Sequence, residues 1–172
     1  MQRLNRNFFT RDVLIVAPQL LGKYIVRRFS DGTTRHYLIT ETEAYRGEED
    51  KACHARKGKT PRTRVMYGEG GLVYVYLVYG IHWMLNIVTG DENHPQAALI
   101  RSIKNIEGPG RVTRHLYIDK AFYGEDLTGS TRLWLEEGIR PPHYTAGPRI
   151  GIEYAGDKWK NKPWRFKTDK PD

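Results

Sequence analysis

The stretch that most constrains the fold is GGLVYVYLVYGIHW, residues 70–83, the most apolar run in the chain. Its β-branched and aromatic residues favour strands, and the Tyr79-Gly80 pair within it favours a tight turn. We therefore predict two strands, over residues 72–79 and 81–88, that meet at this pair in a β-hairpin. Three residues of the run are tyrosines, and a buried phenol needs a hydrogen-bond partner, so a plain core hairpin does not explain the pattern.

The positions of these tyrosines indicate different roles. Side chains alternate along a strand, so Tyr74 and Tyr76 share one face and can line a wall. Tyr79 lies at the turn, where an aromatic side chain has little core to join and is exposed unless a partner receives it. We expect Tyr79 to enter a binding partner.

The rest of the chain predicts few helices and several short strands. We expect a helix over 13–21 with Asp12 as its N-cap and Gly22 as its stop, a short acidic helix over 48–53, and a helix that opens at Gly108-Pro109. Further strands are expected at 23–29 and 35–45, joined by the turn 30–32, and at 96–103, 132–136 and 149–154. Strands joined by hairpin-like turns predict an α+β fold with a mainly antiparallel sheet, in a single domain over residues 1–172.

The chain is basic, with 28 lysines and arginines against 20 acids and a net charge of +8. Either a solvated basic surface or a polyanionic partner, most often nucleic acid, explains such a balance. The segment ARKGKTPRTR, residues 55–64, has five basic residues and no apolar periodicity, so we expect an exposed loop. Its Arg56, Arg62 and Arg64 are candidate nucleic-acid contacts.

Several absences bear on location. The single cysteine, Cys53, excludes an intrachain disulfide and fits a reducing compartment. The segment MQRLNRNFFTRD lacks the apolar core of a signal peptide, and no apolar run approaches the roughly 20 residues of a membrane helix. We expect an intracellular protein without a membrane partner, cytoplasmic and nucleoid-associated in a prokaryote or nuclear in a eukaryote.

The segment ETEAY contains the first candidates for chemistry. Glu41, Glu43 and Tyr45 alternate along a strand and share one face. They are either a solvated edge or a general base beside an aromatic wall, and the five acids between residues 41 and 50 also admit a divalent metal site. Cys53-His54 lacks a second cysteine to complete a zinc site, so His54 is either a hydrogen-bonding pocket residue or a surface histidine.

Two polar residues interrupt apolar strands. Asn86 lies in the sequence MLNIV, and a buried asparagine must be hydrogen-bonded, so it is either structural or a specificity contact. Arg101 interrupts AALIRSI, where a charge needs a paired acid or a bound anion.

Five blocks of the sequence together resemble a known family. ETEAYRGEEDKACHA, TPRTR, YVYLVYGIHWMLN, ALIR and GPGR occur in the order seen in the alkyladenine (3-methyladenine) DNA glycosylases, the methylpurine DNA glycosylase type. The resemblance extends from NFFTRD to KPWRF. It implies a compact fold with a curved antiparallel sheet and a protruding hairpin. It also implies a monofunctional, monomeric enzyme without metal or cofactor, which flips damaged purines out of double-stranded DNA and hydrolyses their N-glycosidic bond.

The resemblance also implies roles for single residues. Glu43 resembles the general base that activates water, and Arg101 resembles its partner. The positions that match the pocket for the flipped base are Tyr45, His54, Tyr76 and Asn86, of which Asn86 matches the residue that crowds the exocyclic amine of guanine. Tyr79 resembles the wedge that enters the minor groove, and the remaining expected DNA contacts are Tyr74, His82, Arg56, Arg62 and Arg64.

The sequence departs from the family at three places, one of which is the short stretch after KPWRF, where members are usually longer. His82-Trp83 follow the wedge position, where members often carry other aromatic residues, and the stretch between Arg101 and Gly108 is short. Two other function classes are compatible with the residues alone. The first is a metal-dependent nuclease that uses the acids of 41–50, and the second is a non-catalytic binder that uses the three hairpin tyrosines as a stacking platform.

Overall fold

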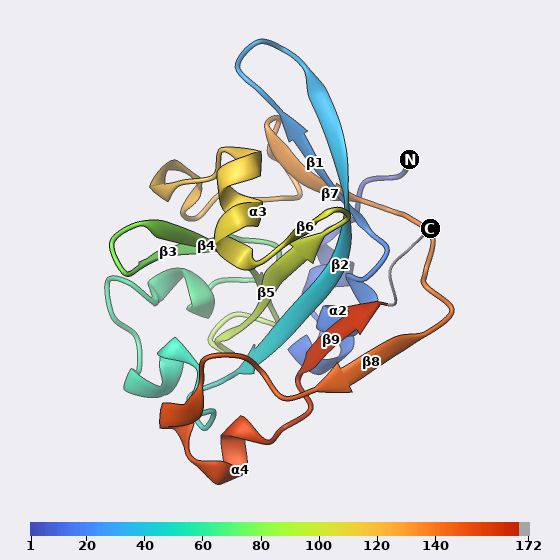
Figure 1. The fold of residues 1–172 in the computed structure, drawn as a ribbon. Helices are drawn as coiled ribbons and strands as arrows, with labels where there is room; N and C mark the ends of the chain where they lie inside the picture. Colours follow the sequence, from blue (N-terminus) through green and yellow to red (C-terminus); the bar gives the residue numbers. More distant parts are fainter. Residues whose placement is uncertain (169–172) are drawn as a thin grey trace.

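The computed structural model describes residues 1–168, which form one curved, mainly antiparallel sheet with short helices around it (Figure 1). The main path of the sheet runs through β3 (Val73–Val78), β4 (His82–Thr89), β5 (Gln96–Ile103), β2 (Thr34–Arg46), β1 (Tyr24–Arg28) and β7 (Leu133–Glu136). The shorter strands β6 (Ile106–Glu107), β8 (Tyr144–Gly147) and β9 (Arg165–Thr168) extend it at the side of β5 and β2. The predicted α+β class is confirmed.

The strand β2 organises the sheet because it pairs with three neighbours. Its first residues pair with β1, and its later residues pair with β5 on one edge and with β9 on the other. The register with β5 shifts around Glu41, an irregularity of the kind that bends a strand and increases its twist. Residues Glu41–Glu43 are consequently paired on both edges in the middle of the sheet.

Four short helices are present among the described residues: α1 (Arg6–Phe9), α2 (Val13–Gln19), α3 (Pro109–Leu116) and α4 (Asp157–Lys160). The Asp12 side chain accepts a hydrogen bond from the Leu14 N–H, as expected of the N-cap, and Gly22 has a φ of +80° where the chain turns toward β1. Pro109 begins α3 as predicted. None of the helices in residues 1–168 is long and apolar enough to cross a membrane.

The predicted tyrosine hairpin is formed by β3 and β4 and lies at the left of Figure 1. The Ile81 N–H donates to the Val78 carbonyl oxygen at 3.1 Å, and both residues between them, Tyr79 and Gly80, have positive φ. Positive φ at both central residues is typical of type I′ turns, which match the twist of the strands. The second hairpin, between β1 and β2, projects at the top of Figure 1 and turns at the predicted residues 30–32.

Two predicted elements are wrong. Residues 48–53 form turns instead of a helix, because the Asp50 carboxylate accepts hydrogen bonds from the Arg46 and Ala52 N–H groups and replaces helical backbone partners. Residues 149–154 are not a strand: Gly151 has a φ of +74°, and a 3₁₀ turn, Glu153–Ala155, follows. The expected loop 55–64 is partly structured, because its first residues belong to the 3₁₀ turn η1 (His54–Lys57) and its last begins the 3₁₀ turn η2 (Arg64–Tyr67). Its basic side chains are exposed.

Candidate active site

A cavity of about 490 Å³ lies beside the β3–β4 hairpin. Its lining comes mainly from β2, β3, β4, β5, residues 52–54 and residues 150–154. Arg62, Met66 of η2 and Pro109 at the start of α3 complete it. The structure brings nine of the twelve predicted site residues to it: Glu43, Tyr45, His54, Arg62, Tyr74, Tyr76, Tyr79, Asn86 and Arg101. Arg56, Arg64 and His82 do not line it. Residues scattered over the chain from 43 to 101 therefore share one cavity.

Glu43 is the buried acid of this cavity, with an exposed fraction of 0%. Its Oε1 accepts a hydrogen bond from the Ile150 N–H at 2.8 Å, and its Oε2 accepts one from the Tyr45 hydroxyl at 2.7 Å. Burial raises the pKa of Glu43, although the Arg101 guanidinium and the two hydrogen bonds act in the opposite direction. Two fixed donors and a raised pKa suit a carboxylate that takes a proton from water.

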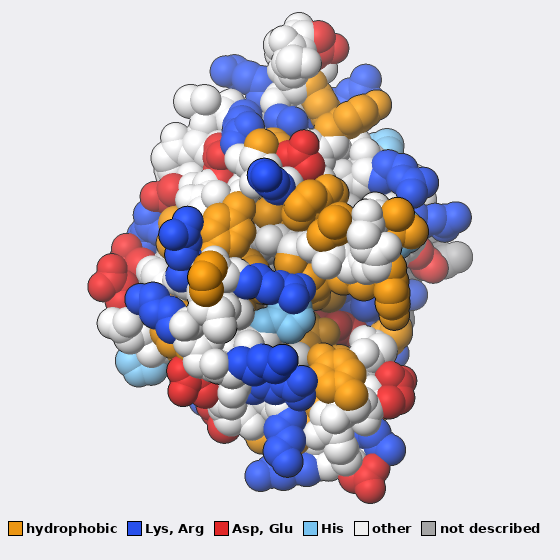
Figure 2. All heavy atoms as spheres, turned by 90° about the vertical axis from the view of Figure 1, so that its left-hand side faces the viewer, with side chains coloured by type: hydrophobic (Ala, Val, Ile, Leu, Met, Phe, Trp, Pro, Cys, Tyr) orange, Lys and Arg blue, Asp and Glu red, His pale blue; other side chains and the backbone are white. Residues whose placement is uncertain are grey.

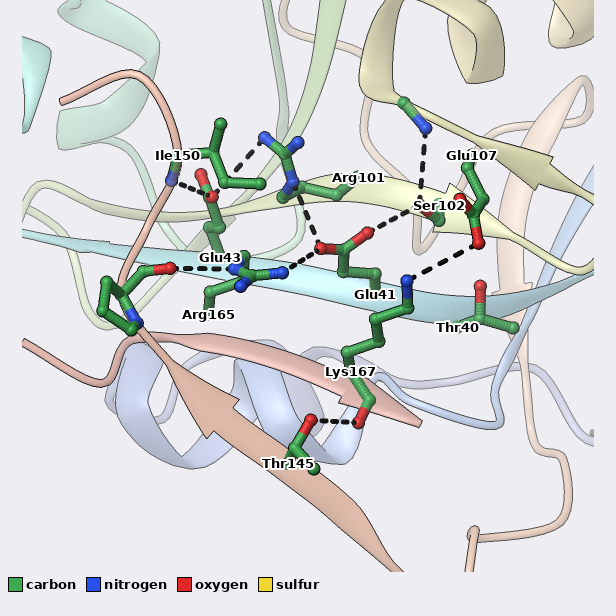
Figure 3. A network of polar contacts seen from close by, with 12 residues as sticks. Thr40, Glu41, Glu43, Arg101, Ser102, Glu107, Thr145, Ile150, Arg165 and Lys167 are labelled. Atoms are coloured by element: carbon green, nitrogen blue, oxygen red, sulfur yellow. Dashed lines mark hydrogen bonds and ion pairs between the residues drawn. The ribbon is translucent and has the colours of Figure 1, made fainter. Parts of the chain in front are cut away.

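Arg101, from β5, lies between two glutamates of β2 (Figure 3). Its Nη1 is 3.4 Å from Glu43 Oε1 and its Nε is 3.5 Å from Glu41 Oε1. Glu41 also accepts hydrogen bonds from the Ser102 hydroxyl at 2.7 Å and from Arg165 at 3.0 Å. Burial acts to raise the pKa of Glu41, but these donors outweigh it and the pKa lies below its ordinary value. Glu41 is a fixed anion that holds Arg101 next to Glu43.

Aromatic side chains form the walls of the cavity. The rings of Tyr74 and Tyr76 lie 5.3 Å apart between centroids, as their shared strand face predicts, and the His54 ring lies 4.5 Å from that of Tyr76. Tyr45 contributes another ring, and its hydroxyl donates a hydrogen bond to Glu43. Such walls fit a flat aromatic ligand, and their electron-rich faces favour a positively charged one.

His54 is an electrically neutral member of these walls. Its Nδ1 lies 2.8 Å from the Tyr74 hydroxyl. Burial, together with the nearby charges of Arg62 and Arg56, lowers the pKa of His54 to about 4, and burial raises the pKa of Tyr74 to about 12. At neutral pH both groups are uncharged, so the cavity can receive a cationic ring without repulsion from the imidazole.

Asn86, from β4, lies at the inner side of the cavity and is buried. Its Nδ2 donates to the backbone oxygens of Tyr74 and Met84, at 3.2 and 3.4 Å. The amide is therefore anchored to its own hairpin while it lines the cavity. Asn86 is thus both hydrogen-bonded to the scaffold and placed to contact a ligand.

Around the mouth of the cavity the side chains are exposed and basic. Tyr79 is 90% exposed at the hairpin tip, and the Arg62 guanidinium lies 5.1 Å over the Tyr76 ring. Arg56, a residue of η1, lies 5.2 Å over the Tyr154 ring, and Arg64 is exposed at the start of η2. Figure 2 shows Lys and Arg side chains spread over this face, around a hollow in which hydrophobic side chains and a histidine are visible.

His82 has a different neighbourhood from the other predicted DNA contacts. Its ring lies against the start of α3, so close that a Cβ added to Gly110 would be 3.0 Å from the imidazole. The absence of a Cβ at Gly110 therefore allows the hairpin to pack against α3. The structure shows His82 joining these two elements.

Sequence reasoning missed the loop 148–155, whose Ile150 N–H donates a hydrogen bond to the Glu43 carboxylate. The Arg149 guanidinium is fully buried, donates to both Asp50 oxygens at 2.6 and 2.9 Å, and lies between the rings of Tyr45 and Trp164. The Arg165 Nε donates to the Pro148 oxygen at 2.8 Å. These contacts fix the backbone that presents the Ile150 N–H to Glu43. Gly151, inside the expected strand, was the one sequence signal against that strand.

The acids between residues 41 and 50 do not converge. Beyond Glu41 and Glu43, their partners are Tyr67 for Glu48, Arg46 for Glu49 and Arg149 for Asp50. Across residues 1–168, no three His, Cys, Asp or Glu side chains come together as a metal site requires. The acidic metal site that the sequence left open is not formed in this part of the chain.

Comparison with known proteins agrees with the resemblance seen in the motifs. The sequence matches the methylpurine-DNA glycosylase family over residues 7–171. It is 40% identical to a protein of Psychrobacter cryohalolentis, over 96% of this chain and 92% of that protein. It is 43% identical to one of Desulfitobacterium hafniense, over 96% and 95%, and 42% identical to one of Methanocella arvoryzae, over 96% and 92%. All three are named "Putative 3-methyladenine DNA glycosylase". This chain belongs to the methylpurine-DNA glycosylase family.

Proposed function

We propose that this protein is a monofunctional DNA glycosylase that removes alkylated purines, such as 3-methyladenine, from duplex DNA. It hydrolyses the bond between the base and C1′ of the deoxyribose and leaves an abasic site. The observation that carries the proposal is Glu43, a fully buried carboxylate with a raised pKa at an aromatic cavity large enough for a nucleobase. Family membership gives the reaction class.

In the proposed reaction, a water molecule attacks C1′ as the base departs. The C1′–N bond breaks with its electron pair going to the base, a C1′–O bond forms, and Glu43 takes a proton from the water. Alkylation gives the purine a positive charge that the departing electron pair neutralises, so the base needs no further acid. The Tyr45 hydroxyl and the Ile150 N–H hold the carboxylate, and Arg101 lies beside it.

Lesion recognition follows from the walls of the cavity. The rings of Tyr45, Tyr76 and His54 provide faces for the flipped base, and the neutral His54 does not repel a cationic purine. Asn86 lies where an exocyclic amine of an undamaged guanine would crowd it. A base reaches the cavity only after it leaves the stack, and we assign to the exposed Tyr79 the filling of the gap that it leaves.

The deciding experiment is mass spectrometry of free bases released from duplexes that each carry one lesion, with and without EDTA. We expect release of a free purine and intact DNA strands, in both conditions. Direct cleavage of the backbone, or loss of all release in EDTA, would support the nuclease alternative. Tight single-strand binding without base release would support the stacking platform instead.

A matched pair of variants tests the role of Glu43. In Glu43→Gln the amide oxygen can still accept from Ile150 while the amide NH₂ donates to the Tyr45 hydroxyl, so the packing is kept and only the proton acceptor is lost. We expect lesion binding to persist and single-turnover release to fall about 10²–10⁴-fold. Glu41→Gln, two residues away, should have a much milder effect on release. Equal losses in the two variants would contradict the assignment of the base.

A further inference from the structure

A second depression lies outside the active site, between the β1–β2 hairpin and α3 (Figure 1). Its volume is about 870 Å³, larger than that of the candidate active site. It shares no lining residue with that site, and we call it the α3 groove. Its charged and aromatic lining residues are Arg27, Phe29, Asp31, Arg35, Tyr37, Arg111, Arg114, His115 and Tyr117.

The arginines that line this groove are not used in ion pairs within residues 1–168. Arg35, Arg111 and Arg114 are exposed, and no carboxylate in residues 1–168 forms an ion pair with them. Six other arginines have a carboxylate partner: Arg6, Arg46, Arg101, Arg132, Arg149 and Arg165. The single acid of the lining, Asp31, accepts hydrogen bonds from Thr33. Arg35 lies 5.9 Å over the Phe29 ring and its charge also acts on Asp31, so Arg111 and Arg114 are the guanidinium groups of the groove best placed to bind an anion.

Aromatic rings are interleaved with these arginines. The rings of Phe29 and Tyr117 meet edge to face at 5.9 Å, and those of Tyr37 and His115 meet at 5.3 Å. Tyr117 is 74% exposed and has a φ of +51°, in the left-handed region that a tyrosine seldom occupies. Glycine is the usual residue at such a helix end. A strained, exposed aromatic residue at a surface site suggests a binding role.

We propose that the α3 groove binds the sugar–phosphate backbone of the DNA duplex on one side of the lesion. This inference rests on the proposed function, which makes DNA the substrate. Unpaired arginines and exposed aromatic rings fit a polyanion that carries sugars and bases. One helix connects the two sites, since Pro109 at the start of α3 lines the active-site cavity and Arg111, Arg114 and His115 line the groove.

The length of α3 sets the expected separation. Eight residues of helix span about 12 Å, which equals roughly four base pairs along a duplex. The groove therefore contacts phosphates a few base pairs from the flipped nucleotide, on one side only. DNA on the other side of the lesion makes no contact with it.

The test measures the affinity for lesion duplexes against salt concentration, in the Glu43→Gln background so that the lesion is not consumed. Two duplexes are compared, one extended by ten base pairs on the side of the groove and one truncated within about three base pairs of the lesion. Arg111→Gln/Arg114→Gln should lower the slope of log affinity against log salt by about two on the extended duplex and should leave the truncated duplex unchanged. The fold fixes the side of the lesion on which the α3 groove lies. A duplex extended on that side should therefore show the reduced salt slope, and a duplex extended on the opposite side should not.

The matched control removes the same charge elsewhere. Arg140 and Lys158 are exposed and do not line the groove, so Arg140→Gln/Lys158→Gln should change both duplexes equally or not at all. An unchanged slope for Arg111→Gln/Arg114→Gln on the extended duplex would overturn the proposal, as would a control that loses as much slope as this variant on the extended duplex and none on the truncated one. Salt-independent binding by the parent protein would instead contradict the proposed function, so the two failures are distinguishable.

Tyr117 provides an independent measurement. Tyr117→Gly relieves the left-handed strain, so its melting temperature should be equal to or above that of the parent protein. Its affinity for the extended duplex should nevertheless fall several-fold, with the truncated duplex unaffected. A purely structural role would move both quantities in the same direction, and that result would remove Tyr117 from the proposed surface.

Discussion

At the scale of single residues, the site depends on two glutamates with opposite environments. Glu41 faces charged donors, and its pKa is lowered, while Glu43 is deeper, receives mainly neutral donors, and its pKa is raised. The two carboxylates lie two residues apart on one strand and both approach Arg101. When their surroundings push the pKa values of two neighbouring acids apart, one acid can have a structural role while the other takes part in the reaction.

The raised pKa of Glu43 predicts the acid limb of the pH–rate profile. The general base must be ionised, so base release should fall as the pH drops through a value above the ordinary 4.5 of a glutamate. His54 titrates lower, at about 4, and should not produce this limb. The measurement is the second-order rate constant for base release between pH 4 and 8. A limb that disappears in His54→Gln would assign it to the histidine.

Asn86 predicts a change in selectivity. Asn86→Ser shortens a side chain that lines the cavity and removes its anchoring bonds to the hairpin backbone, which leaves room for an exocyclic amine. We expect release of guanine-type bases to rise relative to adenine-type bases. The check is competition between two lesion duplexes in one reaction, and an unchanged ratio would exclude Asn86 from discrimination.

At the scale of elements, the loop 148–155 shows how tertiary contacts position the catalytic group. Three consecutive residues are fixed by different partners: Pro148 by Arg165, Arg149 by Asp50 and Ile150 by Glu43. The side chains of Arg149 and Asp50 are both fully buried, so water cannot solvate either charge if its partner is removed.

Arg149→Met should therefore destabilise the protein by about 3–5 kcal/mol, because Asp50 is left as an unpaired buried charge. The loss of loop order should weaken the Ile150 hydrogen bond to Glu43, which raises the pKa of Glu43 further and moves the acid limb to higher pH. Thermal melts and the pH profile measure the two effects. Lys160→Met, which breaks an exposed pair with Asp157, should change neither, and an unshifted limb in Arg149→Met would show that the loop does not tune Glu43.

The same elements show what could be predicted from the sequence. The strand Gln96–Ile103, the start of α3 and the turn at Tyr79-Gly80 follow from local apolar runs, a proline and a glycine, and each was predicted in place. The helix expected over 48–53 and the strand expected over 149–154 failed together, because Asp50 and Arg149 bind each other across 99 residues of sequence. The strands β8 and β9 were missed for the same reason, since they are short and stabilised by distant partners.

At the scale of the whole molecule, part of the exposed basic charge lies at or next to two depressions. Arg62 lines the active-site cavity, Arg56 belongs to η1 beside it, and Arg35, Arg111 and Arg114 line the α3 groove. The β3–β4 hairpin projects at the left of Figure 1, so its tip, with the exposed Tyr79 and Ile81, is on the side that faces the viewer of Figure 2. A surface that combines phosphate-binding charge with one projecting aromatic residue is suited to holding a duplex while a base is displaced.

Tyr79→Ala tests whether this tip acts on DNA or on the fold. Deletion of a buried large aromatic costs about 3–5 kcal/mol, but Tyr79 is 90% exposed, so the melting temperature should barely move. The loss should appear in base flipping, because nothing then fills the gap in the stack. Single-turnover release from a paired lesion should fall about tenfold or more, equivalent to ~1.4 kcal/mol or more, and release from an unpaired or mismatched lesion should fall little. Ile81→Ala, at a neighbouring tip residue that is 69% exposed, is the matched control and should affect paired lesions less. Equal losses on paired and unpaired lesions, or a large melting shift, would show that Tyr79 supports the hairpin and does not act as a wedge.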